Sequence, residues 1–311
     1  MEMGPAERVL AVSVARQYYL EGVSKIDIGK KLGMSRYKVA RLLNACIESG
    51  LVQIHINDSG RVDTALSEAL RARFGLRHVL VAETSDASVD NMRLTLGGLT
   101  AELLEEIISS EDVLGVAWGR TIDVVAQKIR ALPDCAVVQM TGVAGAVEAN
   151  SVDLVRRFAA VARGESYPIY APLVVSDEAA LGVFQRQQGI RDVMDHWLKI
   201  TVAVIAIGGA TSEDSQLYDV LDEADRAEID AAKMACEICA IPFDAAGQPL
   251  QTGFSRRTMG VSFDSLRNIP HVIAAAGGPG KQKAILAALR SGAITSLVTD
   301  QSVARYLMGM G

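Results

Sequence analysis

The sequence predicts an α/β protein in which an N-terminal winged helix-turn-helix domain precedes a doubly wound, Rossmann-like domain. Two patterns indicate this fold. Residues 24–56 have the spacing of two short helices, a tight turn and a β-wing, and from residue 77 onward short β-branched runs alternate with helical patterns. The chain has 311 residues, 50% of them hydrophobic, which suffices for one small and one large domain. We expect these domains to be residues 1–57 and 58–311.

A first helix is expected before the helix-turn-helix, because apolar residues recur at helical spacing near the start of the chain. This helix should pack behind the two that follow it and so complete a compact three-helix unit. The residues assigned to its buried face are Val9, Val12, Ala15, Tyr18 and Tyr19.

The helix-turn-helix comes next. Ile28 and Leu32 lie four residues apart, on one face of a short helix, and Gly33 can adopt the positive φ that ends this helix. Ser35 is placed to cap the second helix, and Gly50 ends it. Apolar residues recur along the second helix every three or four positions and should face inward together: Val39, Leu42, Leu43 and Cys46.

Basic and aromatic side chains lie near the start of this second helix, away from its apolar stripe. Residues 25–41 contain six basic residues and one acidic residue. Residues 1–60 carry eight Lys and Arg against six Asp and Glu (net +2), whereas residues 61–311 carry 23 against 31 (net −8). Positive charge is thus concentrated where DNA phosphates would lie, although a helical hairpin with a solvated basic face remains the alternative. The residues assigned to DNA binding are Ser35, Arg36, Tyr37, Lys38 and Arg41.

The polar, turn-forming stretch at residues 57–60 is the expected domain boundary. A linker helix should follow it, because Leu66, Leu70 and Phe74 recur at helical spacing.

The larger domain should contain a parallel sheet with helices on its faces. Strand patterns occur at residues 78–83, 112–118, 135–140, 201–209, 271–278 and 296–300. Helical patterns separate several of them, at residues 92–108, 122–129 and 281–290. Because such folds bind ligands beyond the carboxyl ends of their strands, we expect the functional residues directly after the strands.

Cysteine usage and hydropathy indicate a cytoplasmic protein. Four cysteines in a chain without a signal-peptide pattern favour a reducing compartment over a disulfide framework. No apolar run approaches the roughly 20 residues that cross a bilayer, so no membrane association is expected. Cys236 and Cys239 form a CxxC pair, but no second pair or histidine cluster lies at ligand spacing, and an apolar strand explains them better. We expect no metal and no cofactor.

Four segments in a fixed order give the chain a resemblance to the SorC/DeoR-type family of bacterial sugar-responsive transcriptional regulators, over nearly its full length. These segments are MSRYKVARLL, LGVAWGRT at residues 114–121, AAGGPGKQKAILAALRSG, and SLVTD followed by Ala304. The resemblance implies a dimeric or tetrameric regulator that binds double-stranded operator DNA. It also implies that the large domain is related to sugar-phosphate isomerases and binds a sugar or sugar phosphate as effector.

Two strand-to-helix turns are the main candidates for effector binding. Gly119, Arg120 and Thr121 follow a strand and open a helix, where free amides, a hydroxyl and the helix dipole can hold an anion. The alternative is an ordinary turn with Thr121 as the helix cap. At residues 277–281 the glycines and lysine resemble a nucleotide-binding P-loop, but the first glycine and the Ser or Thr of that motif are missing. The resemblance implies instead that Lys281 contacts the effector.

The resemblance adds two further residues and excludes one reaction. It places Glu237 near the sugar hydroxyls, although a strand glutamate on the surface is an equal alternative, and it places Asn150 near the ligand. Some relatives form a Schiff base with a sugar through a lysine at the position of Thr141, so that reaction is excluded here.

These observations favour a transcriptional regulator that is controlled by a sugar or sugar-phosphate effector and is not an enzyme. The effector pocket should lie between residues 119–121 and Lys281, and its cations favour a phosphorylated ligand. The rival hypothesis is a sugar-phosphate isomerase with an accessory DNA-binding domain. It requires a general base in the pocket, and the sequence identifies none.

Overall fold

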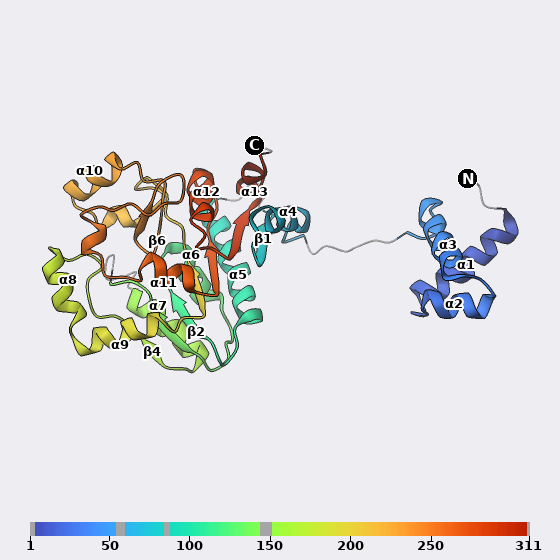
Figure 1. Ribbon diagram of the computed structural model, residues 1–311, viewed down its shortest axis with the longest axis horizontal. Coiled ribbons are helices and arrows are strands. Elements are labelled where there is room, and N and C mark those ends of the chain that lie inside the picture. Colours follow the sequence, from blue (N-terminus) through green and yellow to red (C-terminus); the bar gives the residue numbers. More distant parts are fainter. Residues whose placement is uncertain (1–3, 54–59, 84–87, 144–150, 310–311) are drawn as a thin grey trace. The chain divides into compact units, whose positions relative to one another are not determined.

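The computed structural model describes residues 4–53, 60–83, 88–143 and 151–309 (Figure 1). The chain divides into two compact units, Met1–Asp58 and Ser59–Gly311. The predicted β-wing and domain boundary fall largely on residues 54–59, which lie outside the described residues.

Local capping signals determine where the helices of the smaller unit begin and end. The Ser24 hydroxyl accepts a hydrogen bond from the backbone N–H of Asp27 at 3.2 Å. The Ser35 hydroxyl accepts one from the N–H of Lys38 at 3.3 Å. Gly33 has a φ of 63° and ends the helix before the turn, as predicted. The helices so delimited are α1 (Pro5–Tyr19), α2 (Lys25–Leu32) and α3 (Arg36–Glu48).

The buried face of α1 differs from the predicted one. Val9, Val12 and Tyr19 are 72%, 36% and 37% exposed. Ala15 is buried and Tyr18 is partly buried, as predicted, but the rest of the buried face consists of Ala11 and Val14, in a cluster with apolar residues of α2 and α3. Apolar residues occupy more of the circumference of α1 than its neighbours cover, so periodicity alone does not decide which face packs. The small alanines allow a close approach between α1 and α3.

The larger unit is built on a seven-stranded sheet whose strands all run parallel, in the order β1-β9-β8-β5-β2-β3-β4. The chain passes from β2 through β3 to β4 on one side of the sheet, and from β5 through β8 to β9 on the other. The order therefore reverses between β2 and β5. The strand bounds are β1 (His78–Ala82), β2 (Val113–Val116), β3 (Ala136–Gln139), β4 (Ser166–Tyr167), β5 (Val202–Ile205), β8 (His271–Ala275) and β9 (Ser296–Asp300).

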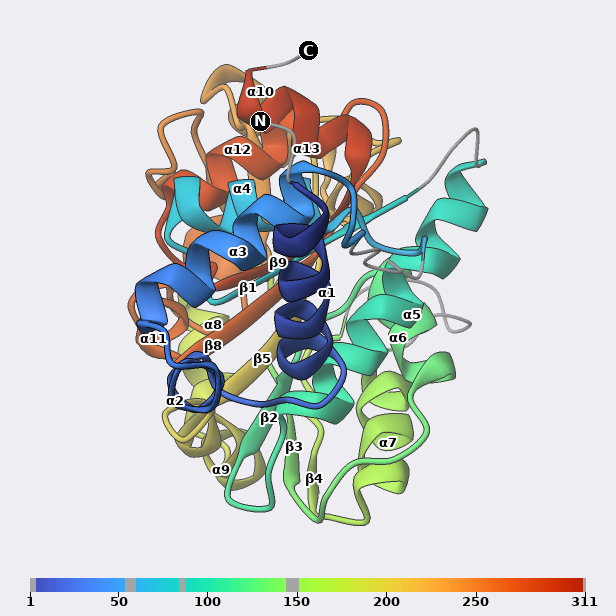
Figure 2. The same cartoon turned by 90° about the vertical axis from the view of Figure 1, so that its right-hand side faces the viewer.

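Helices cover both faces of this sheet (Figure 2). Along β5, Val202 and Val204 join one hydrophobic cluster, whereas Ala203 and Ile205 join the other, as the two-residue period of a strand requires. The first cluster includes residues of α5 (Val89–Ile107), α6 (Arg120–Lys128) and α7 (Ser151–Ala162). The second includes residues of α4 (Thr64–Phe74), α9 (Gln188–Trp197), α11 (Phe263–Asn268), α12 (Gln282–Arg290) and α13 (Gln301–Met308). The predicted parallel α/β domain is confirmed.

The predicted linker helix belongs to the larger unit. It is α4, whose Leu70 is fully buried in the same core cluster as Val79 of β1 and Val303 of α13. Its apolar stripe is used for packing on the sheet.

A two-stranded hairpin replaces the single apolar strand expected around the CxxC pair. It consists of β6 (Cys236–Ile238) and β7 (Ile241–Phe243), which pair antiparallel. Cys239 and Ala240 form the turn, with φ values of 52° and 62°. Positive φ raises the energy of residues other than glycine, and glycine is common in such turns. Surrounding contacts must therefore hold Cys239 and Ala240 in this conformation.

The larger unit also contains the helices α8 (Glu178–Gln185) and α10 (Glu223–Ala231) and two short 3-10 helices, Gln216–Asp219 and Ser255–Arg257. The acidic start of α10 is not simply an exposed surface, because Asp225 is buried and pairs with Arg257. Throughout the described ranges, every helix is too short or too polar to cross a membrane.

Candidate functional site

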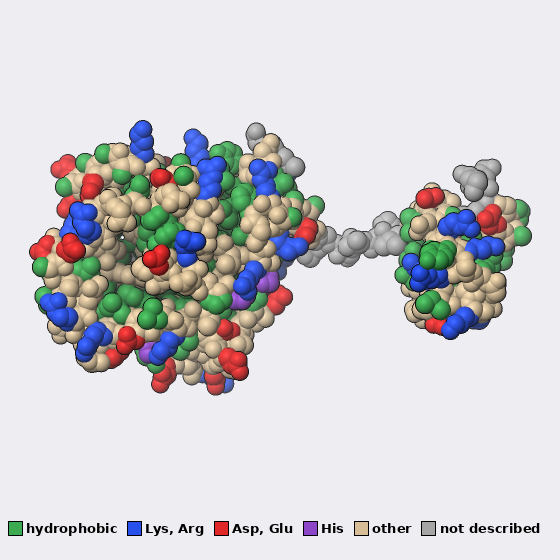
Figure 3. Space-filling view, viewed as in Figure 1, with side chains coloured by type: hydrophobic (Ala, Val, Ile, Leu, Met, Phe, Trp, Pro, Cys, Tyr) green, Lys and Arg blue, Asp and Glu red, His purple; other side chains and the backbone are tan. Residues whose placement is uncertain are grey.

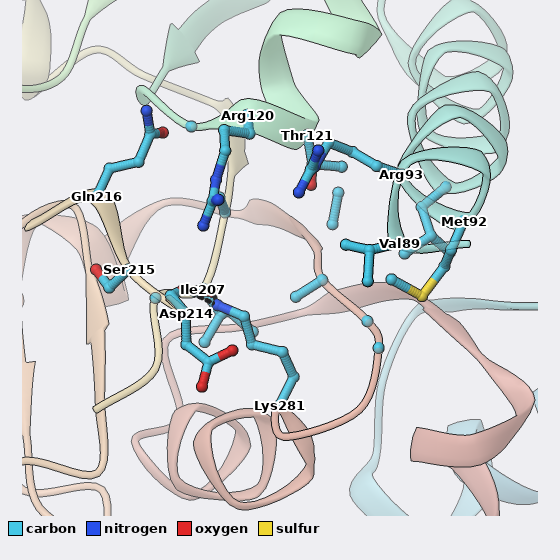
Figure 4. Close-up of a pocket in the computed structure, with 18 of the residues that line it drawn as sticks. Val89, Met92, Arg93, Arg120, Thr121, Ile207, Asp214, Ser215, Gln216 and Lys281 are labelled. Atoms are coloured by element: carbon cyan, nitrogen blue, oxygen red, sulfur yellow. Dashed lines mark hydrogen bonds between the residues drawn. The ribbon is translucent and has the colours of Figure 1, made fainter. Parts of the chain in front are cut away.

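A pocket of about 320 Å³ opens where the carboxyl ends of β2, β5 and β8 meet. β2 and β5 are the neighbours between which the strand order reverses, and this is where doubly wound sheets bind their ligands. Figure 4 shows side chains converging there from the sheet and the flanking helices. The residues that line this pocket include Arg93, Gly119, Arg120, Thr121, Glu237 and Lys281.

The turn after β2 forms one wall of the pocket. Gly119 has a φ of 149°, and a Cβ there would lie 2.7 Å from the Cβ of Ala206, so this position requires glycine. Gly119, and not Thr121, occupies the cap position of α6. Because glycine has no side chain to cap the helix, the first amides of α6 are available to a ligand, and Thr121 adds its hydroxyl to the same wall.

Lys281 lies at the cap position of α12, on the opposite side of the pocket. Its ammonium group donates hydrogen bonds to the carbonyl oxygens of Ile207, at 2.8 Å, and Asp214. Burial lowers the pKa of Lys281, and the nearby carboxylates of Glu237 and Asp214 oppose this shift. The Lys281 side chain therefore ties down the segment that follows β5.

Arg120 reaches the same segment from α6. Its Nη2 donates to the carbonyl oxygen of Glu213 at 2.9 Å. In Figure 4 its side chain extends into the pocket from the start of α6. Arg120 and Lys281 thus hold the adjacent carbonyls of Glu213 and Asp214 from two sides.

Glu237 is buried in the pocket wall, which excludes the alternative of a glutamate on the surface. Its carboxylate accepts a hydrogen bond from the Ser215 hydroxyl at 3.0 Å. The other carboxylate oxygen accepts from the backbone N–H of Ala240 at 3.0 Å, within the strained turn between β6 and β7. Burial raises the pKa of Glu237, whereas these hydrogen bonds and the charge of Lys281 oppose the increase.

Several lining residues were not predicted. Asp214 and Ser215 belong to the segment after β5, and the glycines at 208–209 that follow this strand are the signal that could have indicated them. Arg93 has no comparable local signal, because it lies inside α5 and far from any strand end in sequence. Asn150, predicted to lie near the ligand, falls outside the described residues.

The predicted DNA-binding residues are exposed on the smaller unit, at the start of α3. Tyr37 is 68% exposed, and the Arg36 guanidinium packs over its ring with 4.8 Å between the guanidinium carbon and the ring centre. On the face of this unit that is visible in Figure 3, Lys and Arg side chains lie among hydrophobic and a few acidic ones. The hydroxyl of Ser35 is used for capping α3.

The glycine-rich turn after β8 is held by an acidic side chain and not shaped for a nucleotide. The backbone N–H of Gly278 donates to Asp300 at 2.6 Å. A Cβ at Gly277 would lie 2.5 Å from the same carboxylate. Cys236 and Cys239 are both buried, and burial raises the pKa of each thiol, so neither is a reactive thiolate at neutral pH.

Comparison with known proteins identifies the family. The Sugar-bind family model, which describes a sugar-binding domain, matches residues 61–309. The chain belongs to this family. The deoxyribonucleoside regulator of Bacillus subtilis (strain 168) is 29% identical to this chain over 316 residues, which cover 98% of the chain and 99% of the relative. The sorbitol operon regulator of Klebsiella pneumoniae is 25% identical over 308 residues, with 96% and 97% covered.

The same fold occurs in the crystal structure of the full-length sorbitol operon regulator SorC from Klebsiella pneumoniae. The superposition has a TM-score of 0.75 and covers 99% of this chain and 100% of SorC, at 24% identity. The resemblance to SorC/DeoR-type regulators is thereby confirmed. This family member is a sugar-responsive transcriptional regulator and not an enzyme, so the isomerase hypothesis is wrong.

Proposed function

We propose that the smaller unit is a winged helix-turn-helix that binds double-stranded operator DNA through the start of α3. The support is the tight turn at Gly33 between two capped helices, followed by exposed basic and aromatic side chains on the face of α3 that does not pack. Phosphate contacts would provide most of the affinity, and base contacts the specificity. The residues proposed to bind DNA are Ser35, Arg36, Tyr37, Lys38 and Arg41.

The effector, a sugar or sugar phosphate, binds in the pocket at the switch point between β2 and β5. The observation that carries this proposal is the convergence of cationic, hydroxyl and carboxylate side chains in one pocket of a sugar-binding domain. Cations and free amides suit a phosphate, and carboxylates accept hydrogen bonds from sugar hydroxyls. The residues proposed to bind the effector are Gly119, Arg120, Thr121, Glu237 and Lys281, together with Asn150 from the part of the chain that is not described.

The regulator works in the cytoplasm as a homodimer or homotetramer held together by its larger unit. A single helix-turn-helix makes few base contacts, so selective operators are usually read by paired subunits on symmetric half-sites. Effector binding in the larger unit would change the spacing of the paired smaller units and so change DNA affinity.

The experiment that tests this proposal measures DNA binding with and without candidate effectors. Fluorescence anisotropy would give the Kd for DNA from upstream of the protein's own gene and for a scrambled control. Thermal shift first selects ligands from a panel of sugars, polyols and their phosphates, because a ligand that binds the native state raises its melting temperature. A selected ligand should change the operator Kd by about 5- to 150-fold. Binding of a ligand with no change in operator affinity would contradict the proposal.

A further inference from the structure

The two cations predicted to hold a phosphate already have partners within the chain. Lys281 donates to the carbonyl oxygens of Ile207 and Asp214, and Arg120 donates to that of Glu213. An ammonium group has three hydrogens, so two of the three on Lys281 are engaged with the backbone. The Lys281 side of the pocket thus has little donor capacity left for a phosphate.

Acidic groups lie on that same side. Asp214 and Glu237 both line the pocket, and Glu237 is buried with its carboxylate 3.0 Å from the Ser215 hydroxyl. In Figure 4, Asp214 and Lys281 lie beside each other. Carboxylates would repel a phosphate dianion but accept hydrogen bonds from hydroxyl groups. This end of the pocket therefore suits the hydroxyls of a sugar.

Arg93 lies at the other end. It belongs to the second turn of α5, its side chain is 21% exposed, and it lines the pocket together with Thr121. Figure 4 shows the Arg93 side chain extending from α5 so that its guanidinium lies next to Thr121. The described partner of Arg93 is Asp90, one turn earlier, with Nη1 and Oδ1 2.7 Å apart. Asp90 is 84% exposed, so water screens this pair and leaves the guanidinium donors that face the pocket available.

We propose that Arg93, with the Thr121 hydroxyl and the first amides of α6, binds the phosphoryl group of the effector and makes the pocket selective for phosphorylated over neutral sugars. Lys281 holds the segment 207–214 against the sugar end and has one ammonium hydrogen left for a sugar hydroxyl. This inference rests on the proposed function, since it assigns the two ends of the same pocket. Arginine suits the role because its planar guanidinium can form two parallel hydrogen bonds to phosphate oxygens.

The test compares four variants with the wild type: Arg93→Gln, Arg93→Lys, Asp90→Asn and Lys281→Gln. The probes are inorganic phosphate, and glucose 6-phosphate, fructose 6-phosphate and ribose 5-phosphate with their unphosphorylated sugars. Melting temperature is followed against probe concentration at constant ionic strength, and any pair that binds is then titrated calorimetrically. Asp90→Asn is the matched control, because it removes the ion pair but keeps the Arg93 cation.

Arg93→Gln should weaken binding of phosphate-bearing probes by about 10- to 100-fold and leave the affinity for neutral sugars unchanged. Arg93→Lys should lie between this variant and the wild type, because it keeps the charge without the planar fork, and it serves if Arg93→Gln does not fold. Asp90→Asn should bind phosphate at least as tightly as the wild type. Lys281→Gln should weaken the binding of a sugar and of its phosphate by the same factor.

Two failures can be distinguished. If the wild type binds phosphate-bearing probes and both Arg93 variants bind them equally well, Arg93 is not the phosphate ligand, and the proposed function is unaffected. If the wild type binds no phosphate-bearing probe more tightly than its neutral counterpart and does not bind inorganic phosphate, this inference is wrong, and binding of a neutral sugar would leave the proposed function intact. A loss of phosphate binding in Asp90→Asn as large as in Arg93→Gln would show that the ion pair only supports α5.

Discussion

At the scale of single residues, the carboxylate of Glu237 is closely packed in the pocket wall. A Cβ at Gly208 would lie 2.1 Å from Oε1 of Glu237 and 2.4 Å from Oγ of Ser215. Glycine after β5 thus lets the carboxylate and the hydroxyl meet. The second carboxylate oxygen accepts a hydrogen bond from the N–H of Ala240, so Glu237 also stabilises the strained turn between β6 and β7.

The burial of Glu237 predicts a specific pH dependence of stability. Because burial raises the pKa of Glu237 in the folded state, its contribution to stability is largest below the ordinary carboxyl pKa and is lost as pH rises through the raised value. Glu237→Gln cannot ionise, so its melting temperature should rise relative to that of the wild type as pH increases above the ordinary carboxyl pKa. Thermal unfolding of both proteins over a series of pH values checks it. A difference between the two proteins that does not change with pH would contradict the prediction.

DNA reading by α3 predicts different effects for two arginines of the smaller unit. Arg41→Ala should weaken operator binding by about 1–3 kcal/mol, because its exposed side chain lies on the proposed recognition face. Arg16→Ala removes the same charge from α1 and should have a much smaller effect. Anisotropy titrations of both variants at several salt concentrations distinguish the loss of a specific DNA contact from a general loss of electrostatic attraction. Equal losses for both variants would refute the recognition assignment.

At the scale of elements, α5 is held against α6 through a glycine. A Cβ at Gly97 would lie 2.4 Å from Cγ1 of Val124, whereas a Cβ at Gly98 would meet nothing within 4 Å. The two neighbouring glycines therefore have different roles, one in packing and one without a packing constraint. Since α5 carries Arg93 and α6 carries Arg120 and Thr121, this contact also sets the width of the proposed phosphate end.

This contact predicts opposite effects for the same substitution at adjacent positions. Gly97→Ala should destabilise the protein by about 1–3 kcal/mol, because the methyl group overpacks the contact with Val124. Gly98→Ala should stabilise it by about 0.5–1 kcal/mol, because alanine loses less backbone entropy than glycine in a helix. Urea unfolding of both variants measures the two free energies. The same sign for both would show that the helices adjust to remove the contact.

At the scale of the whole molecule, the larger unit contains its own sheet and two hydrophobic clusters, one on each face. The smaller unit has a separate cluster. A unit with its own core can fold independently, so the two proposed activities should be separable.

A fragment covering residues 59–311 should therefore fold, oligomerise and bind the effector without the smaller unit. Sedimentation velocity measures its association state, and calorimetry its affinity, which should match that of the full chain. The full chain run under the same conditions is the control. If the fragment is folded but stays monomeric at about micromolar concentration, the larger unit does not hold the oligomer together, and this prediction is wrong.

The sequence by itself determined the features that depend on neighbouring residues. The cap at Ser35, the end of a helix at Gly33 and the alternation of strands and helices all follow from short-range sterics and hydrogen bonds. The turn at Gly119 belongs to the same class, because a glycine between a strand and a helix is visible in the local pattern.

Only the tertiary structure decided which distant residues meet. Arg93 reaches Thr121 because α5 packs on α6, and Glu237 faces the pocket because a hairpin turns it inward beside Ser215. The buried face of α1 was likewise chosen by its neighbours. The physical reason is that strand order and helix packing minimise the exposed apolar surface of the whole unit. This quantity depends on all the elements together, so it cannot be inferred from the residues next to each site in the sequence.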